Sequence, residues 1–443
     1  MKRIFGTFAY GDGPRNGCWW DETCTILPRG PLGTDTQTDV AIVGAGVTGL
    51  SAALHLARAG VGATVVDAND VGWGASGRNG GFCCLGGSKA DDAGIESRFG
   101  RAGRLAYRRS ELEAVRLVER LVDELSLDVD RHSAGETMLA HRASDADAMR
   151  VRAATVSENY GFDPVVIEKD SLAAGGFGRF FHGGLTIPAG FGLNPRKYVG
   201  GLADAAEAAG ATIFGQSGVD RITPAPGHRW HLDINGVTLC ADRVIVATNG
   251  YSSEDIPDWL RGRFMPGQSN VLVTRPLTTS ELEAQGWTTD QMCYDTRNLL
   301  HYFRLLPDRR FLFGMRGGLL SGPAAEIRAR RRVRADFESM FPAWRDVESA
   351  HAWSGMVCLA RDLMPFVGAV PGQKGMFAGL CYHGNGVAMG TYSGALLAAL
   401  AQGKPPDMPF PDAMKTPLRR FELGPLRRLL MPAAYAAYAF ADR

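Results

Sequence analysis

The chain has 443 residues, of which 45% are hydrophobic and 21% charged, with a net charge of +1. This length exceeds what one hydrophobic core usually supports, so we expect two connected domains in a soluble globular protein. The near-neutral charge excludes nucleic acid or an anionic membrane as a bulk partner, and no apolar run is long enough to span a bilayer.

The first 37 residues form an N-terminal extension, and they lack the apolar core of a signal peptide. We therefore expect a cytoplasmic protein. Trp19 and Trp20 are interpreted as packing residues near a substrate entrance. The eight cysteines show no paired spacing and the nine histidines no pair at helical spacing, so the sequence predicts neither a disulfide scaffold nor a metal site.

Residues 39–67 predict a nucleotide-binding unit, DVAIVGAGVTGLSAALHLARAGVGATVVD. Residues 40–43 form a buried strand, the G-x-G-x-x-G turn opens a helix, and residues 63–66 form a second strand. The helix N-terminus offers unpaired N–H groups to phosphates, and the acid that ends the second strand accepts hydrogen bonds from ribose. This order predicts a dinucleotide but leaves FAD and NAD open. The predicted binding residues are Gly44, Gly46, Val47, Thr48, Gly49, Asp67 and Ala68.

Residues 71–82, VGWGASGRNGGF, follow the second strand. With the fingerprint, this loop resembles the D-amino-acid-oxidase-like FAD-dependent oxidoreductases, most of all their glycine/sarcosine oxidase and gamma-glutamylputrescine oxidoreductase branch. The resemblance implies a loop beside the pyrophosphate and the flavin ring, bordered by Phe82 and Cys83. It also implies that Ser76 and Arg78 bond phosphate or ring oxygens. The loop residues predicted to bind FAD are Ser76, Gly77, Arg78, Asn79, Gly80 and Gly81.

The middle of the chain continues the resemblance. A charged helical run begins at residue 101, and a strand-like segment, HSAGETMLAH, follows it. Asn194-Pro195 begins a second helix that Gly210 ends, and Val219 is then expected against adenine. A hairpin is predicted at about 229–240 with Asn235-Gly236 as its turn. Residues 242–253 predict another buried strand, whose turn supplies three further cofactor candidates: Thr248, Asn249 and Gly250.

The segment from 256 to 349 predicts a strand, VLVTRPL, and a hairpin, HYFRLLPDRRFLFGMRGG. The resemblance implies an antiparallel sheet over the substrate face of the flavin. Arg304 and Arg316 are the candidates for holding a substrate carboxylate, since arginine binds carboxylates with two parallel hydrogen bonds. The catalytic candidates are Tyr302, Arg304, His383 and Tyr251. The arginine-rich stretch at 325–341 is interpreted as a solvated helix.

Residues 376–404 predict a strand, a glycine loop and a helix whose N-terminus would stabilise negative charge on reduced flavin. Gly384, Asn385, Gly386 and Val387 are the predicted contacts. Many relatives carry histidine where this chain has Asn385, and Leu312 falls near the oxygen-activating lysine of sarcosine oxidases. Oxidase and dehydrogenase activity therefore both stay open. Cys358 is out of register with the cysteine that attaches flavin in some sarcosine oxidases, so we expect non-covalent FAD.

These observations predict an α/β fold with a discontinuous Rossmann-type FAD-binding domain at 38–100, 190–255 and 350–405. An α+β substrate domain is expected at 101–189 and 256–349, and a helical tail at 406–443. The predicted activity is FAD-dependent oxidation of the C–N bond of an amine or N-substituted amino acid to an imine, with oxygen or another acceptor reoxidising the flavin. The alternatives are a flavoprotein dehydrogenase of a hydroxy compound and a non-catalytic FAD-binding subunit. The substrate and oligomeric state stay open.

Overall fold

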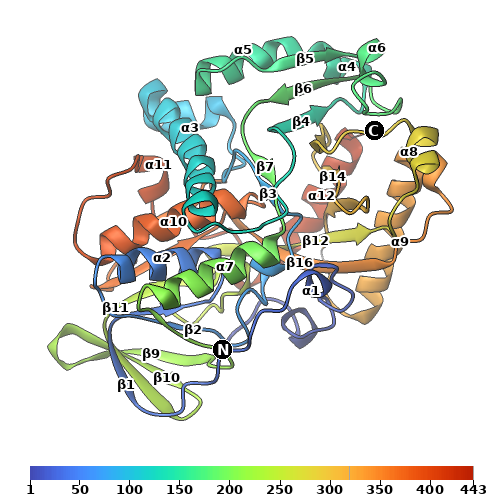
Figure 1. Cartoon of the computed structure of the whole chain (residues 1–443). Coiled ribbons are helices and arrows are strands. Elements are labelled where there is room, and N and C mark those ends of the chain that lie inside the picture. The colour runs from blue at the N-terminus through green and yellow to red at the C-terminus, as the bar shows by residue number, and fades with distance from the viewer. Residues whose placement is uncertain (319, 443) are drawn as a thin grey trace.

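Two large sheets organise the computed structural model, which describes residues 1–318 and 320–442 (Figure 1). The first sheet has the strand order β17-β18-β11-β1-β2-β8. Strands β8, β2, β1, β11 and β18 run parallel, and β17 adds an antiparallel edge. Its strands are β1 (Thr36–Val43), β2 (Ala63–Val66), β8 (Thr212–Phe214), β11 (Val237–Val246), β17 (Phe366–Ala369) and β18 (Met376–Leu380).

Three helices cover one face of this sheet: α2 (Val47–Arg58), α7 (Pro195–Ala208) and α10 (Gly386–Ala401) (Figure 1). The closest approach is between α2 and α10, since a Cβ on Gly394 would lie 2.3 Å from the Thr48 carbonyl oxygen. The predicted start of α7 is confirmed, because the Asn194 side chain accepts hydrogen bonds from the Arg196 and Lys197 backbone N–H groups. The predicted strand–turn–helix–strand unit is likewise confirmed.

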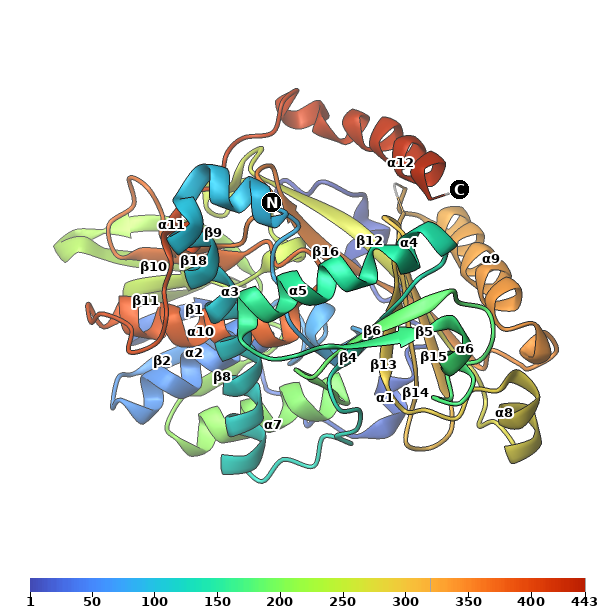
Figure 2. The ribbon, with the colours of Figure 1, turned by 90° about the horizontal axis from the view of Figure 1, so that it is seen from above.

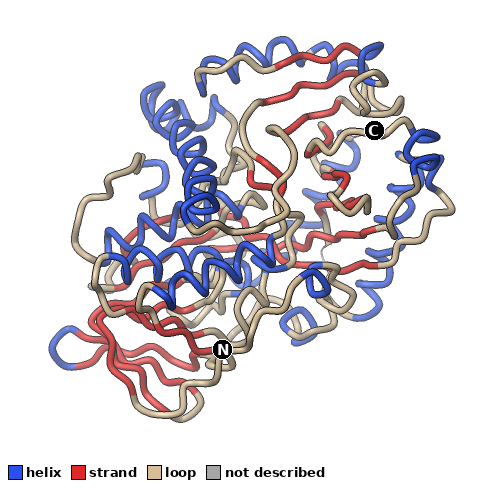
Figure 3. The backbone as a smooth tube through the Cα atoms, in the orientation of Figure 1, coloured by secondary structure: helices blue, strands red, loops and turns tan. Residues whose placement is uncertain are grey.

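Strands β9 (Val219–Ala225) and β10 (Arg229–Ile234) extend from β11 on the other side (Figure 3). The predicted hairpin turn is confirmed, with Asn235 at φ 50° and Gly236 at φ 86°, as a tight two-residue turn requires. The buried strand predicted from residue 242 is present, but it is the second half of a longer strand that starts earlier than predicted. Strand β11 begins in the hairpin at Val237 and continues without a break to Val246, because its first half pairs with both β10 and β1.

The second sheet has the order β16-β12-β15-β14-β13-β4-β6-β5. One face packs on helix α9 (Pro323–Met340) through a phenylalanine-rich core that includes Phe303, Phe313 and Phe337. The opposite face carries Tyr302 and Arg316 and lines a cavity. Its strands are β4 (Glu136–Leu139), β5 (Val165–Glu168), β6 (Gly183–Ile187), β12 (Phe264–Val273), β13 (Met292–Asp295), β14 (His301–Leu305), β15 (Phe311–Arg316) and β16 (His351–Ala360).

The domain boundaries stay a prediction. Strand β16 falls within the predicted FAD-binding segment 350–405, yet it pairs with β12 in the second sheet. A short ladder joins β3 (Phe82–Cys83) to β7 (Phe191–Gly192). The other helices are α1 (Trp20–Thr23), α3 (Asp92–Glu124), α4 (Ala143–Asp147), α5 (Met149–Tyr160), α6 (Lys169–Leu172), α8 (Thr279–Gln285), α11 (Asp412–Lys415) and α12 (Leu430–Ala441).

Helix α12 forms the tail predicted to be helical and runs along the outside of the molecule (Figure 2). Within residues 1–318 and 320–442, the chain has no helix with the length and apolar character needed to cross a membrane.

Candidate active site

A large cavity lies between the first sheet and the polar face of the second, and segments far apart in sequence line it. Most of the predicted residues meet there. The predicted residues that line it are Gly44, Gly46, Val47, Thr48, Asp67, Ala68, Ser76, Arg78, Asn79, Gly80, Phe82, Val219, Thr248, Asn249, Tyr251, Tyr302, Arg316, Cys358, Gly384, Asn385, Gly386 and Val387.

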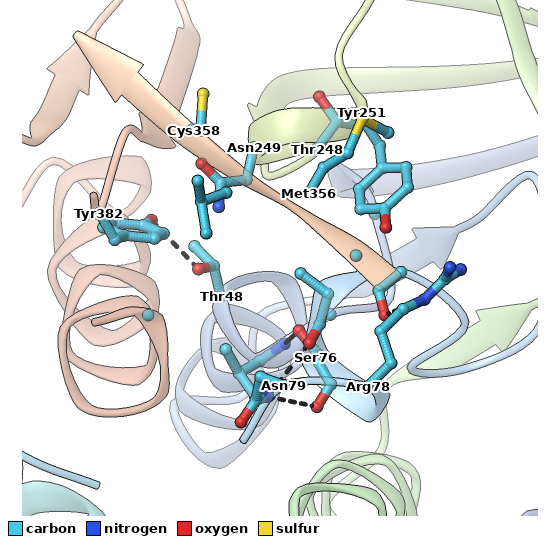
Figure 4. Close-up of a pocket in the computed structure, with 18 of the residues that line it drawn as sticks. Thr48, Ser76, Arg78, Asn79, Thr248, Asn249, Tyr251, Met356, Cys358 and Tyr382 are labelled. Atoms are coloured by element: carbon cyan, nitrogen blue, oxygen red, sulfur yellow. Dashed lines mark hydrogen bonds between the residues drawn. The ribbon is translucent and has the colours of Figure 1, made fainter. Parts of the chain in front are cut away.

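The N-terminus of α2 forms one end of the cavity (Figure 4). The Val47 backbone N–H donates to Ser76 Oγ at 3.0 Å, and a Cβ on Gly46 would lie 2.8 Å from that same oxygen. No acidic side chain occupies the first turn of α2. The helix therefore presents bare backbone and its positive dipole end to the cavity, which suits a phosphate.

Gly49 has a different role, because it lies behind the cavity wall. A Cβ there would lie only 1.9 Å from the Gly44 carbonyl oxygen. The glycine thus lets α2 press against the turn after β1, as the fingerprint predicts.

Asp67 ends β2 and closes the same turn. Its Oδ2 accepts from the Ala45 N–H at 2.7 Å and its Oδ1 from the Asn69 N–H at 2.8 Å. Burial raises the pKa of this carboxyl to about 6. Each carboxylate oxygen keeps a second lone pair, so Asp67 can still accept from a ribose hydroxyl.

The loop side chains Arg78 and Asn79 mainly hold the loop itself. Arg78 is buried and donates to the Trp73 carbonyl oxygen at 2.7 Å, with its guanidinium 4.4 Å from the Trp73 ring centroid. Asn79 donates to the Ser76 carbonyl oxygen at 2.9 Å and accepts from the Gly81 N–H at 2.7 Å (Figure 4). Trp20 adds a bond to the Asn79 carbonyl oxygen, so the N-terminal tryptophan packs on this loop.

The N-terminus of α10 reaches the cavity from the other end of the chain. Asn385 precedes it without capping it: its Nδ2 donates to the Leu85 carbonyl oxygen at 2.7 Å, and its Oδ1 accepts from Arg316 Nη2 at 3.2 Å. The first turn of α10 also contains no acidic side chain. Thr48 and Tyr382 tie the two helices together through a 3.1 Å bond between their hydroxyls (Figure 4).

Two uncapped helix N-termini, a bare glycine cradle and a carboxylate at the end of β2 thus face one cavity. The helix ends can bind phosphates, and Asp67 can bind a ribose. A long prosthetic group could reach from one of these places to the other within the same cavity. The chemistry of this donor set fits FAD. Cys358 also lines the cavity, with its Sγ 3.5 Å from the Sγ of Cys381.

The second sheet supplies the polar roof. Tyr302 on β14 shares a hydrogen bond with Ser269 on β12, with 2.9 Å between their hydroxyl oxygens, and burial raises the pKa of the Tyr302 hydroxyl. Arg316 ends β15 and is partly buried there. Burial lowers the pKa of its guanidinium, which donates a hydrogen bond to Asn385 Oδ1.

Several predicted residues lie behind the cavity wall. Arg304 is on the same sheet face as Tyr302, but Trp20 and Phe82 enclose its guanidinium, which donates to the Leu193 carbonyl oxygen at 2.8 Å. His383 is buried with both ring nitrogens bonded, Nε2 to the Ala360 N–H and Nδ1 to the Gly87 carbonyl oxygen, and burial lowers its pKa to about 4. The others behind the wall are Gly49, Gly77, Gly81, Cys83, Gly250 and Leu312.

Among the cavity residues that sequence reasoning missed are Lys89, Glu136 and Tyr294. Lys89 follows the flavin loop, and the nearby Arg316 cation together with burial lowers its pKa to about 7. Glu136 and Tyr294 come from β4 and β13 in the roof. The signal for Glu136 was a lone acid at an inward position of a short apolar strand. Among the described residues, no group of three or more His, Cys, Asp and Glu side chains is placed to hold a metal ion.

A family model described as "FAD dependent oxidoreductase" (DAO) matches residues 39–400. The chain is 30% identical over 429 residues to "Probable oxidoreductase OrdL" of Rhizobium meliloti, covering 96% of this chain and 97% of that protein. It is 29% identical over 382 residues to "Gamma-glutamylputrescine oxidoreductase" of Escherichia coli, covering 85% and 86%.

Solved structures share the fold. Glycine oxidase from Geobacillus kaustophilus matches with a TM-score of 0.70 at 19% identity, covering 86% of this chain and 99% of that one. Iminodiacetate oxidase from Chelativorans matches with a TM-score of 0.69 at 22% identity, covering 86% and 100%. The predicted combination of a dinucleotide-binding unit and an antiparallel sheet is therefore confirmed.

Proposed function

This chain belongs to the DAO family of FAD-dependent oxidoreductases, and from that premise we propose that it oxidises the C–N bond of an amine or N-substituted amino acid to an imine. One observation supports the proposal above others. A single cavity connects the N-termini of α2 and α10 to the polar roof formed by Tyr302 and Arg316. A cofactor held at the first place and a small molecule held at the second would share one enclosed space.

FAD is the cofactor of this family, and we propose non-covalent binding. The α2 N-terminus would hold the pyrophosphate, Asp67 the ribose of the adenosine half, and Val219 the adenine. The loop from Ser76 to Gly81 and the N-terminus of α10 would border the flavin ring. When bound, FAD supplies a two-electron hydride acceptor that oxygen or another oxidant reoxidises.

The chain's own residues then position the substrate and exclude water. The substrate carbon loses a hydride while the nitrogen lone pair becomes the second C–N bond, so the nitrogen must have given up its extra proton before this step. No nucleophile or acid–base pair is required for that step, because alignment of the carbon in a dry cavity supplies the acceleration. The imine released then hydrolyses in water.

Three predicted residues are proposed to contact substrate. Tyr302 and Tyr251 line the cavity, and Arg316 offers a half-buried guanidinium for an anionic group. Arg304 and His383 are proposed as positioning residues instead: Arg304 holds the segment at Leu193, and His383 joins residues 87 and 360.

Anaerobic mixing of the yellow holoenzyme with candidate compounds tests this function. The proposal expects flavin bleaching by amines or N-substituted amino acids, followed by peroxide formation or electron transfer to a dye when oxidant returns. Bleaching by alcohols alone would indicate a dehydrogenase of hydroxy compounds. No bleaching by either class would indicate a non-catalytic FAD-binding subunit.

A further inference from the structure

The roof of the cavity carries opposite charges at two corners. The strands β4, β13, β14 and β15 lie side by side in that order. Met138, Tyr294, Tyr302 and Gly314 pair across them in one row. Glu136 precedes this row by two residues on β4, and Arg316 follows it by two residues on β15. A spacing of two keeps both on the cavity face, where each lines the cavity.

The two corners are far apart. Three inter-strand steps of about 4.8 Å and four residues of about 3.4 Å separate their backbone positions by roughly 20 Å before sheet twist. Even if both side chains extend toward each other, the gap between the carboxyl and the guanidinium is longer than several C–C bonds. The pKa of Glu136 agrees with this separation. Burial, a hydrogen bond from Cys84 and the nearby Glu111 determine that pKa, and neither Lys89 nor Arg316 contributes to it.

Glu136 lacks a charged partner. It is 5% exposed, its carboxyl receives a hydrogen bond from the Cys84 thiol, and within the described part of the chain it forms no ion pair. A buried acid of this kind is normally paired with a cation. The Tyr294 hydroxyl lies beside it on the cavity wall. This corner is therefore suited to an ammonium or protonated amine.

The opposite corner lacks an anion. Arg316 lies close enough to Lys89 to disfavour the charge of that lysine, and among the described residues neither forms an ion pair with an acid. Arg316 bonds the neutral Asn385 amide. Arg316 is half-buried and Lys89 is more exposed, and both line the cavity. The two neighbouring cations suit a carboxylate, which would offset the repulsion between them.

We propose, resting on the amine-oxidising function above, that the substrate is a bipolar chain with an amine group at Glu136 and a carboxylate at Lys89 and Arg316. The distance between the corners favours a substrate whose amine and carboxylate are separated by several carbons. It disfavours an α-amino acid, in which both charged groups are attached to one carbon. Glu136 and Lys89 are thus specificity-determining residues of this cavity.

Three probes test the length and charge requirement: 6-(methylamino)hexanoate, N-methylglycine and N-methylhexylamine, each assayed by anaerobic flavin reduction. We expect kcat/KM for the first to exceed that for the other two at least about 10-fold. E136Q should lower kcat/KM for the first probe at least about 10-fold. R316M should lower it at least about 10-fold more than for N-methylhexylamine, which lacks the carboxylate.

K89M provides a second route if R316M fails to retain flavin, and the same ratio of the two probes is expected to fall. Equal rates with all three probes, or R316M and K89M variants that slow every probe alike, would overturn the bipolar substrate while leaving amine oxidation intact. If no amine bleaches the flavin at all, the proposed function falls first and this inference with it.

Discussion

Replacing the unpaired acid Glu136 by glutamine should make the protein more stable, and only at high pH. Burial raises the pKa of its carboxyl from 4.5 to about 8. Between these two values the folded protein binds more protons than the unfolded chain, so stability falls as pH rises and then levels off above about 8. At 1.36 kcal/mol per pH unit, the full loss is about 5 kcal/mol.

E136Q removes this titration and should therefore raise the free energy of unfolding by about 2–5 kcal/mol at pH 9. At pH 5, only half a pH unit above the unfolded pKa of 4.5, little of the loss has developed, and the gain should stay below about 1 kcal/mol. Urea denaturation followed by circular dichroism at both pH values, at saturating FAD and without substrate, measures the difference.

Glu111 gives a matched control, because it is equally buried but fully paired. It accepts from Arg108 Nη1 at 2.9 Å and from the Tyr160 hydroxyl at 2.6 Å. E111Q should lower stability by about 1–3 kcal/mol, since it weakens charge-assisted bonds to buried donors. An E136Q gain that is the same at pH 5 and pH 9, or a loss at pH 9, would refute the assignment of Glu136 as an uncompensated buried acid.

Other predictions concern the cofactor and the cation pair. G49A should yield protein with little or no bound flavin, because its new methyl would collide with the Gly44 carbonyl oxygen. The loss of flavin is measured as loss of the absorption band at about 450 nm. A fully yellow G49A protein would contradict the role of Gly49 in shaping the cofactor-binding turn. Acid precipitation should leave the yellow FAD in the supernatant, whereas colour in the pellet that C358S abolishes would indicate a covalent bond to Cys358. For a carboxylate-bearing substrate, kcat/KM should fall as pH rises above about 7, because Lys89 loses its proton there. Lys89 lies beside Arg316 and the neutral His383. K89M should remove this decline.

The nucleotide-binding unit could be predicted from sequence because its constraints are local. Gly49 must be small for a helix to approach a strand six residues away, and the chain order of strand, turn and helix states this directly. Asn235-Gly236 likewise fixes its turn through backbone conformation alone. Such features need no knowledge of distant segments.

The substrate side could not be predicted in the same way, because it depends on how strands from distant segments pair. Arg304 and Tyr302 are equivalent by alternation, yet Trp20 from the N-terminal extension covers one and leaves the other at the cavity. Glu136 meets the roof only because β4 joins β13 across more than 150 residues. Periodicity identifies the face of a strand but not the neighbours that cover it.

The convergence of residues 44–49 with residues 384–387 has a consequence for biosynthesis. The two helix ends that would hold the prosthetic group are made early and late in translation, since α2 leaves the ribosome more than 300 residues before α10 does. Flavin capture should then be among the final events of maturation, and proteolytic removal of α10 should release the pigment and uncover the face of α2 that packs against it. Colour retained by the purified polypeptide would accordingly serve as a simple indicator that synthesis and folding had reached completion.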